Sequence, residues 1–155
     1  MTHATIRPAR LSDAEALHCH CYPDATLETV RDYLAWCLRQ ADKGRIVRLV
    51  ADVDGQAVGN VQLTAWGSVG EIGSLVVGEP FRRRGLARLL LMAAIGEARQ
   101  CGLWAVDITV RSDEVELAAF YRSLGFQLEL DAEKELSHPR SPAPIQLLRM
   151  QLCGR

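Results

Sequence analysis

Apolar and polar positions alternate along several short stretches of the chain, and this alternation predicts β-strands. Successive side chains of a strand point to opposite faces, so a period of two marks a strand with one buried face. Short apolar runs rich in Val and Ile predict strands that are buried on both faces. The predicted strands are residues 4–7, 46–53, 57–66, 71–77, 103–110, 126–130 and 148–152.

A second pattern, with apolar positions three or four residues apart, predicts helices between these strands. In the second predicted helix the apolar face consists of Leu27, Val30, Leu34 and Cys37. The predicted helices are residues 12–19, 27–43, 84–100 and 113–125.

Polar residues mark where three of these helices begin. Thr26 has the position of an N-cap, whose side-chain oxygen accepts from a backbone N–H of the first turn. Ser12 with Glu15, and Asp113 with Glu116, have the spacing of a capping box. We therefore expect reciprocal caps at the first and last predicted helices.

Turn residues and the order of elements predict the fold. Asp54 and Gly55 lie between two predicted strands, and a type I′ hairpin turn needs positive φ at both positions. Residues 46–77 should therefore form three antiparallel strands. The strand at 103–110 follows a helix, so a β-α-β crossover can place it parallel to residues 71–77. We expect an α+β (mixed α/β) fold in the order β-α-α-β-β-β-α-β-α-β-β, with a central mixed sheet flanked by helices. No repeat or linker divides the chain, so residues 1–155 should form a single domain.

The turn after residues 71–77 has the features of a phosphate site. Gly78 and Pro80 end the strand, and three consecutive arginines precede Gly85 at the start of an apolar helix. A helix start exposes backbone N–H groups and carries the positive end of the helix dipole, so it binds anions readily. Glycine allows close approach of the backbone because it has no Cβ. The turn therefore predicts a site for the pyrophosphate of a nucleotide-like cofactor.

Composition and charge narrow the class of protein. The chain has 155 residues, of which 48% are hydrophobic and 24% charged, and its formal net charge is −1, which is ordinary for a globular protein. A balanced charge gives no general attraction to nucleic acid or to an anionic membrane, so neither is an expected partner. The five cysteines are odd in number and lack Cys-x-x-Cys spacing, and neither a signal peptide nor an apolar run of ~20 residues is apparent. We expect a cytoplasmic protein without a disulfide framework or a structural zinc site.

These motifs, in this order of strands and helices, resemble the GNAT superfamily of acetyl-CoA-dependent N-acetyltransferases. The family's phosphate-binding signature is Q/R-x-x-G-x-G/A after a strand, and residues 82–87 are Arg-Arg-Arg-Gly-Leu-Ala. Its fourth helix often ends in a tyrosine followed by a Gly-Phe pair, which correspond to Tyr121, Gly125 and Phe126. The resemblance covers essentially the whole chain, with only a general match over residues 1–44.

The resemblance implies how acetyl-CoA would be held. In the family the signature holds the pyrophosphate, and the peptide-like pantetheine arm pairs with the central strand, which requires that strand and the next to splay apart. A backbone N–H near Val77 would polarise the acetyl carbonyl. Many members carry a cofactor-contacting asparagine seven residues before the tyrosine, where this chain has Glu114. The implied cofactor-binding residues are Leu75, Val76, Val77, Arg82, Arg83, Arg84, Gly85, Leu86, Ala87, Arg88 and Glu114.

The resemblance also implies two catalytic residues. Attack on a thioester needs a neutral amine, so a base or a water relay must first remove a proton. Glu71 matches the general-base glutamate of the family's histone-acetylating branch, and Tyr121 matches the tyrosine that protonates the leaving thiolate in many members. The period of a strand predicts one shared face for Glu71, Gly73, Leu75 and Val77. The implied function is direct acetyl transfer, in a ternary complex, to a primary amine of a small molecule or a protein.

Three alternatives stay open at this level. They are a non-catalytic acetyl-CoA-binding regulatory module, a transferase for another acyl-CoA, and a nucleotide-binding protein of another fold. The run His18-Cys19-His20-Cys21 suggests a metal cluster, but adjacent ligands on one helix point in different directions, so no metal is expected. Many family members form homodimers, and no residue pattern here decides the oligomeric state.

Overall fold

The computed structural model describes residues 3–129 and 145–153, and within them the elements follow the predicted order. The strands are β1 (Ala4–Pro8), β2 (Ile46–Val53), β3 (Gln56–Trp66), β4 (Val69–Val77), β5 (Ala105–Arg111), β6 (Gln127–Leu128) and β7 (Ile145–Gln151). The helices are α1 (Ala14–His20), α2 (Leu27–Asp42), α3 (Leu86–Gln100) and α4 (Val115–Ser123). Short 3-10 turns, η1 (Leu11–Asp13) and η2 (Glu79–Phe81), precede α1 and α3. The predicted mixed fold is confirmed.

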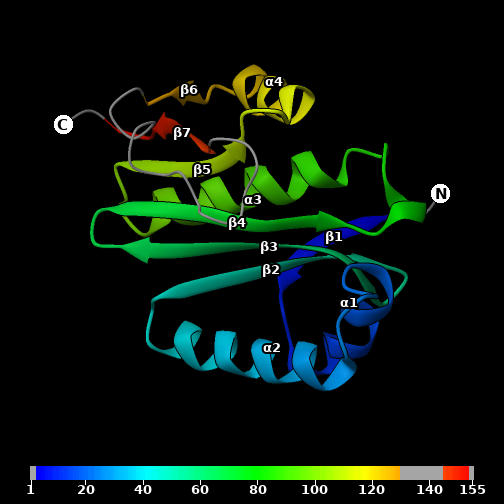
Figure 1. Ribbon diagram of the computed structural model, residues 1–155. Helices are drawn as coiled ribbons and strands as arrows, with labels where there is room; N and C mark the ends of the chain where they lie inside the picture. The colour runs from blue at the N-terminus through cyan, green and yellow to red at the C-terminus, as the bar shows by residue number, and fades with distance from the viewer. Residues whose placement is uncertain (1–2, 130–144, 154–155) are drawn as a thin grey trace.

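The strands form one seven-stranded sheet in the order β1-β2-β3-β4-β5-β7-β6 (Figure 1). The predicted antiparallel meander of β2, β3 and β4 is confirmed, and so is the parallel pairing of β4 with β5. Among the described strands this is the one parallel pair, because α3 carries the chain back along the sheet before β5 begins. β4 therefore has an antiparallel neighbour, β3, on one side and a parallel neighbour, β5, on the other.

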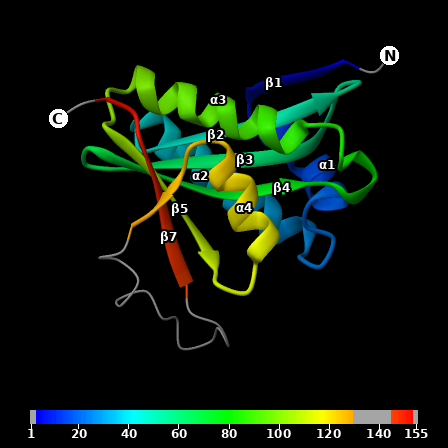
Figure 2. The same ribbon diagram turned by 90° about the horizontal axis from the view of Figure 1, so that it is seen from above.

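Helices cover both faces of the sheet. In Figure 1, α1 and α2 lie on one side of β2 and β3, and Figure 2 shows α3 and α4 together over the other side. Two hydrophobic clusters match these layers. One joins α3 and α4 to the sheet through side chains such as Leu90 and Phe126, and the other joins α1 and α2 to it through Leu17 and Leu34. Each face of the sheet thus has its own helical layer.

Two local predictions are confirmed in detail. Thr26 caps α2, since its side-chain oxygen accepts from the N–H of Thr29 at 3.1 Å. The hairpin between β2 and β3 has positive φ at both central residues, 53° at Asp54 and 86° at Gly55, as a type I′ turn requires. Both features depend only on residues close together in sequence.

The capping box predicted at Ser12 is wrong, because a contact with β1 determines the local structure. Ser12 lies inside η1, and the Asp13 carboxylate instead accepts from the Arg10 N–H at 2.7 Å. The same carboxylate accepts two hydrogen bonds from the Arg7 guanidinium, at 2.8 and 2.9 Å. Burial raises the pKa of Asp13, but these hydrogen bonds outweigh it and hold that pKa below its ordinary value. The ion pair ties the start of α1 to the edge of the sheet.

The second predicted capping box, Asp113 with Glu116, is also wrong. Glu114 is the N-cap residue of α4, and its side chain makes no cap hydrogen bond to the helix. Its carboxylate accepts from the Arg111 N–H at 3.1 Å, and Asp113 accepts from the Arg111 side chain at 3.2 Å. The end of β5 therefore competes with the helix for these carboxylates.

Several predicted boundaries shift by a few residues. Helix α3 begins at Leu86, two residues later than predicted, because Gly85 has a left-handed conformation with φ of 79°. Strand β6 contains only Gln127 and Leu128 of the predicted 126–130. Residue 130 and the predicted loop at 131–142 lie outside the described residues.

A bulge in β4 overturns the predicted face of Glu71. Asn60 of β3 pairs with Val76 and Gln62 pairs with Gly73, so β4 has one extra residue between these pairs, and Ser74 has φ of 54°. The extra residue reverses the alternation along the strand. Glu71 and Gly73 therefore face α2, whereas Leu75 and Val77 pack with the α3 cluster.

Candidate active site

β4 and β5 separate near the middle of the sheet. They pair only from Val69–Glu71 to Ala105–Asp107, although β4 continues to Val77 and β5 to Arg111. The splay that the resemblance implied is therefore present. Beyond the last pair, one edge of β4 faces a cleft instead of a neighbouring strand, so its backbone groups on that edge can pair with a ligand.

A cleft of about 580 Å³, which we call the α3–α4 cleft, lies in this gap. Its walls come from the end of β4, the start of α3 and one side of α4. Its lining residues are Leu75, Val76, Val77, Arg82, Ala87, Glu114, Leu117, Phe120 and Tyr121. Most of these side chains are apolar, and Arg82 and Glu114 are the charged ones.

A smaller cavity of about 190 Å³, which we call the turn cavity, continues the cleft around the start of α3. Val77, Arg82, Ala87 and Phe120 line both spaces. The turn cavity adds Phe81, Arg83, Gly85, Leu86 and Arg88. The two cavities are lined by every cofactor-binding residue that the resemblance implied except Arg84. The guanidinium of Arg84 instead lies over the Phe81 ring, 5.5 Å from its centroid.

The turn that begins α3 has backbone N–H groups that face open space. Gly85 and Arg83 both have positive φ, 79° and 65°, which orients consecutive N–H groups toward the helix start. A Cβ added at Gly85 would meet no atom within 4 Å, so the space above this residue is open. Leu86 is only 5% exposed, so its side chain belongs to the core and only its backbone faces the turn. Such a helix start can hold a phosphate group.

Arg82 has a structural contact in addition to its charge. Its Nε donates to the Val77 carbonyl at 2.8 Å, which fastens the turn to the end of β4. The chain after β4 is therefore held in one path between the strand and α3.

Tyr121 lies in the wall of the α3–α4 cleft and is 6% exposed. Its ring packs between Phe120 and Phe126, with centroid distances of 5.6 and 6.0 Å. Burial, with a further contribution from the Glu114 carboxylate, raises the pKa of Tyr121 to about 12. The phenol therefore stays protonated at neutral pH, in the form that can donate a proton.

Glu71 lies apart from these side chains. It is exposed and lines neither the α3–α4 cleft nor the turn cavity. In the sheet it stands between Thr64 of β3 and Asp107 of β5, at the last pair before β4 and β5 separate. Its side chain is thus on the α2 face, at the entrance to the splay.

A third space, the α1–α2 cavity of about 240 Å³, lies on that opposite face. Its lining is mostly apolar and reaches β4 at the bulge: Leu17, Tyr22, Ala25, Thr29, Val30, Tyr33, Leu34, Arg48 and Ser74. Ser74 lines this cavity and the next residue, Leu75, lines the α3–α4 cleft. The two spaces therefore adjoin β4 from opposite faces at the bulge.

A buried polar cluster at this cavity was missed from the sequence. Arg48 pairs in register with Gln62 and donates to its Oε1, and it also donates to the Oδ1 of Asn60 and to the Tyr22 hydroxyl. The sequence does place polar residues at inward positions of two predicted strands, Arg48 on one and Asn60 and Gln62 on the other. Alternation alone does not show whether such residues bind one another or face solvent.

The histidine and cysteine run on α1 has other contacts. His18 Nε2 lies 2.8 Å from the Ala25 carbonyl, and His20 Nε2 lies 3.2 Å from Gln56 Oε1. Burial raises the pKa of the Cys21 thiol to about 11. Across residues 3–129 and 145–153, no group of three or more His, Cys, Asp and Glu side chains has the arrangement of a metal site. In the same ranges no helix is long and apolar enough to cross a membrane.

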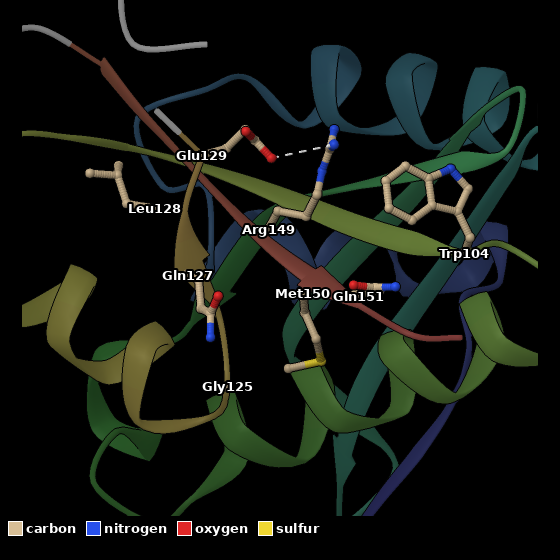
Figure 3. A pocket seen from close by; sticks show the side chains of 8 residues that line it. All are labelled: Trp104, Gly125, Gln127, Leu128, Glu129, Arg149, Met150 and Gln151. Carbon is tan, nitrogen blue, oxygen red and sulfur yellow. Dashed lines mark ion pairs between the residues drawn. The ribbon is translucent and has the colours of Figure 1, made fainter. Parts of the chain in front are cut away.

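Figure 3 shows a further pocket of about 360 Å³ beside β6 and β7. Its arginine, Arg149, points toward Glu129 and also pairs with Asp107, at 3.5 and 2.7 Å. The pocket shares no lining residue with the α3–α4 cleft or the α1–α2 cavity. None of the predicted catalytic and cofactor-binding residues lines this pocket.

Comparisons with known proteins agree with this geometry. The family model described as the acetyltransferase (GNAT) family matches residues 11–126. An L-amino acid N-acetyltransferase, AaaT of Escherichia coli (strain K12), is 28% identical over 149 residues, which cover 86% of this chain and 89% of that protein.

Solved structures share the fold. RimL, a ribosomal L7/L12 alpha-N-protein acetyltransferase in complex with coenzyme A, matches with a TM-score of 0.80 at 18% identity, covering 98% of this chain and 96% of RimL. The acetyltransferase yncA of Salmonella typhimurium, solved with acetyl-CoA, has a TM-score of 0.75 at 20% identity, covering 98% and 95% of the two chains.

Proposed function

This chain belongs to the GNAT family of acetyltransferases, and from that premise we propose that it moves the acetyl group of acetyl-CoA to a primary amine by direct attack in a ternary complex. We propose that residues 1–155 form the single domain that does so. The acceptors named for its relatives are L-amino acids and the terminal amine of a ribosomal protein. Both are amines that are neutral only after losing a proton.

The observation that carries this proposal is the α3–α4 cleft, which runs from the splay of β4 and β5 to the start of α3. Its two ends suit the two ends of the cofactor. The free N–H groups and the arginines around Gly85 suit a pyrophosphate, and the open edge of β4 at Leu75–Val77 suits the amide groups of pantetheine. The lack of any atom near a Cβ at Gly85 leaves room for the phosphates.

The reaction uses groups on both faces of β4. On the α2 face, Glu71 accepts a proton from the acceptor ammonium, directly or through water, and frees the nitrogen lone pair. That nitrogen forms a bond to the acetyl carbon near Val77, where a backbone N–H stabilises the developing oxyanion. The carbon–sulfur bond then breaks, and Tyr121 in the cleft protonates the leaving thiolate. The nitrogen gives its second proton to water, which leaves a neutral amide, and the tyrosinate takes back a proton from solvent.

We expect Glu71→Gln to lower kcat/KM for the acceptor by about 10-fold at pH 7, a modest loss because a water relay can still accept the proton. The defect should shrink as pH rises toward the amine pKa, since more acceptor is then neutral without help. Steady-state kinetics from pH 6.5 to 9.5 measure this. Glu28→Gln, an exposed change in α2, is the control and should leave the profile unaltered. An equal rate for Glu71→Gln and wild type at every pH would remove Glu71 from the mechanism.

The proposed function is tested with acetyl-CoA and a panel of amines, by following release of the free thiol and the acetylated product. We expect acetylation of at least one amine class with turnover. Tight acetyl-CoA binding without any transfer would instead identify a regulatory binding module. Faster transfer from succinyl- or propionyl-CoA would identify a transferase for another acyl group.

We include a cytoplasmic location in this proposal. All five cysteines are free thiols, which suits a reducing compartment. Measuring the activity in fractionated cells of the source organism would test this placement.

A further inference from the structure

Arg48 is a buried cation whose described partners are all neutral. It is 5% exposed and lies in the middle of β2. Its guanidinium donates to amide oxygens of Asn60 and Gln62 and to the Tyr22 hydroxyl, and it lies 5.3 Å from the Tyr33 ring centroid. Its Nε is buried without any hydrogen-bond partner. Nη1 also donates to Cys37 Sγ at 3.8 Å, so among the described residues only the Nε–H of the five N–H donors lacks an acceptor, and none of the acceptors is a carboxylate.

Two other partly buried arginines each have carboxylate partners. Arg7 pairs with the carboxylates of Asp13 and Asp52, each at 2.8 Å. Arg149 pairs with Asp107 and Glu129. Arg48 is more buried than either, yet no carboxylate of the described residues lies within ion-pair distance of it.

A buried charge without a counter-ion is costly, because transfer out of water is repaid only by close opposite charge and satisfied hydrogen bonds. A guanidinium binds a carboxylate with two parallel hydrogen bonds, which is a stronger arrangement than its bonds to neutral oxygens. The surroundings of Arg48 therefore suit a carboxylate that arrives with a ligand.

The cavity beside Arg48 indicates what else that ligand carries. Its volume of about 240 Å³ is lined mainly by carbon atoms from α1 and α2, including Leu17, Val30 and Leu34. A ligand seated here would bury an apolar group. A polar or charged group placed against these three side chains would find no hydrogen-bond partner among them, which is unfavourable.

The ligand must also present the amine that is acetylated, and the position of the bulge indicates where this amine would lie. Asn60 accepts from Arg48 through Oδ1 and donates through Nδ2 to the Ser74 carbonyl at 3.2 Å. One amide side chain thus separates the guanidinium from the bulge, beyond which the α3–α4 cleft begins at Leu75. In an α-amino acid a single carbon joins amine and carboxylate, so both groups can span this short distance.

We propose that the α1–α2 cavity is the acceptor site for a free α-amino acid with an apolar side chain, whose carboxylate binds Arg48 and whose amine lies at the Ser74–Leu75 bulge. The proposal rests on the proposed acetyl transfer for its role in turnover, but binding can be tested alone. It excludes a protein N-terminus as the preferred acceptor, because a peptide has an amide where Arg48 requires a carboxylate.

The test is calorimetric titration of the full chain, saturated with CoA so that no turnover occurs, with L-leucine and with L-leucinamide. We expect leucine to bind at least about 30-fold more tightly, the loss that follows from removing a charged hydrogen bond. No acetyl transfer occurs in this mixture, so differences in amine reactivity cannot produce the preference. Equal affinity for the two compounds would overturn the proposal.

Two variants and one control place the effect at Arg48. Arg48→Met should weaken leucine binding by about 30-fold and leave leucinamide unchanged. Gln62→Glu puts a carboxylate beside Arg48 within the protein, so it should weaken leucine binding by supplying Arg48 with a counter-ion of its own. The control, Arg45→Met, removes an exposed arginine just before β2 and should change neither affinity.

The outcomes separate this proposal from the proposed function. Acetylation of other amines by a protein that does not bind leucine would overturn the Arg48 site and leave acetyl transfer intact. Leucine binding that depends on Arg48, in a protein that transfers no acetyl group, would support the site and overturn the function.

Discussion

Tyr121→Phe should lower kcat for acetyl transfer about 100-fold, the range typical of losing a positioned general acid. The hydroxyl is the group at stake, because phenylalanine keeps the ring packing against Phe120 and Phe126. The leaving thiolate would then have to take its proton from water. A 100-fold loss corresponds to about 2.7 kcal/mol of transition-state stabilisation.

The pKa of Tyr121 determines the expected pH dependence. Burial and the Glu114 carboxylate raise that pKa to about 12, so the wild-type phenol stays protonated throughout the range from pH 7 to 9.5. The ratio of wild-type to variant kcat should therefore be constant over this range. An alkaline loss of activity caused by Tyr121 itself would appear only as pH approaches its raised pKa.

Steady-state kinetics with the acceptor saturating check this prediction. KM for acetyl-CoA should change little, since no charged contact to the cofactor is removed. Ser123→Ala deletes another hydroxyl from α4, one that donates to the Phe120 carbonyl at 2.6 Å and lines neither the α3–α4 cleft nor the turn cavity, and should retain wild-type kcat. Full activity of Tyr121→Phe at every pH would show that another group protonates the thiolate.

Ala87→Glu should weaken acetyl-CoA binding by roughly 100-fold or more, because it sets a negative charge where the pyrophosphate is expected. Ala87 lines both the α3–α4 cleft and the turn cavity. A glutamate in the first turn of a helix is favoured by the helix dipole, by about 0.3–1 kcal/mol. The thermal midpoint should therefore stay the same or rise while the affinity falls.

Calorimetric titration with acetyl-CoA and a thermal melt of the same sample measure the two effects. Leu89→Glu is the matched control: it adds the same charge two residues later, at a side chain that is 47% exposed and lines neither cavity. Its affinity should stay within about 3-fold of wild type, since an exposed charge is largely screened. Undiminished affinity in Ala87→Glu would place the pyrophosphate elsewhere.

Much of this site could be predicted because its parts are local. Strand β4, the turn at residues 82–85 and helix α3 follow one another in sequence, and each has its own signal: β-branched residues, glycine, and apolar spacing. Thr26 and the Asp54–Gly55 turn were predicted correctly for the same reason. The predicted capping boxes failed where an arginine of the preceding strand, Arg7 on β1 or Arg111 on β5, hydrogen-bonds to a carboxylate at the helix start.

By itself, then, the sequence determined the order of elements, the family resemblance and the anion-binding turn, since all of these depend on residues close together in the chain. Only the tertiary structure decided which face of β4 each residue occupies. The bulge at Ser74 comes from pairing with β3, and it turns Glu71 toward α2 while Leu75 faces the α3–α4 cleft. The tertiary structure also brings Arg48, Asn60 and Tyr22 together beside one cavity. Pairing register and packing between helices and sheet join residues far apart in sequence, and no local pattern specifies them.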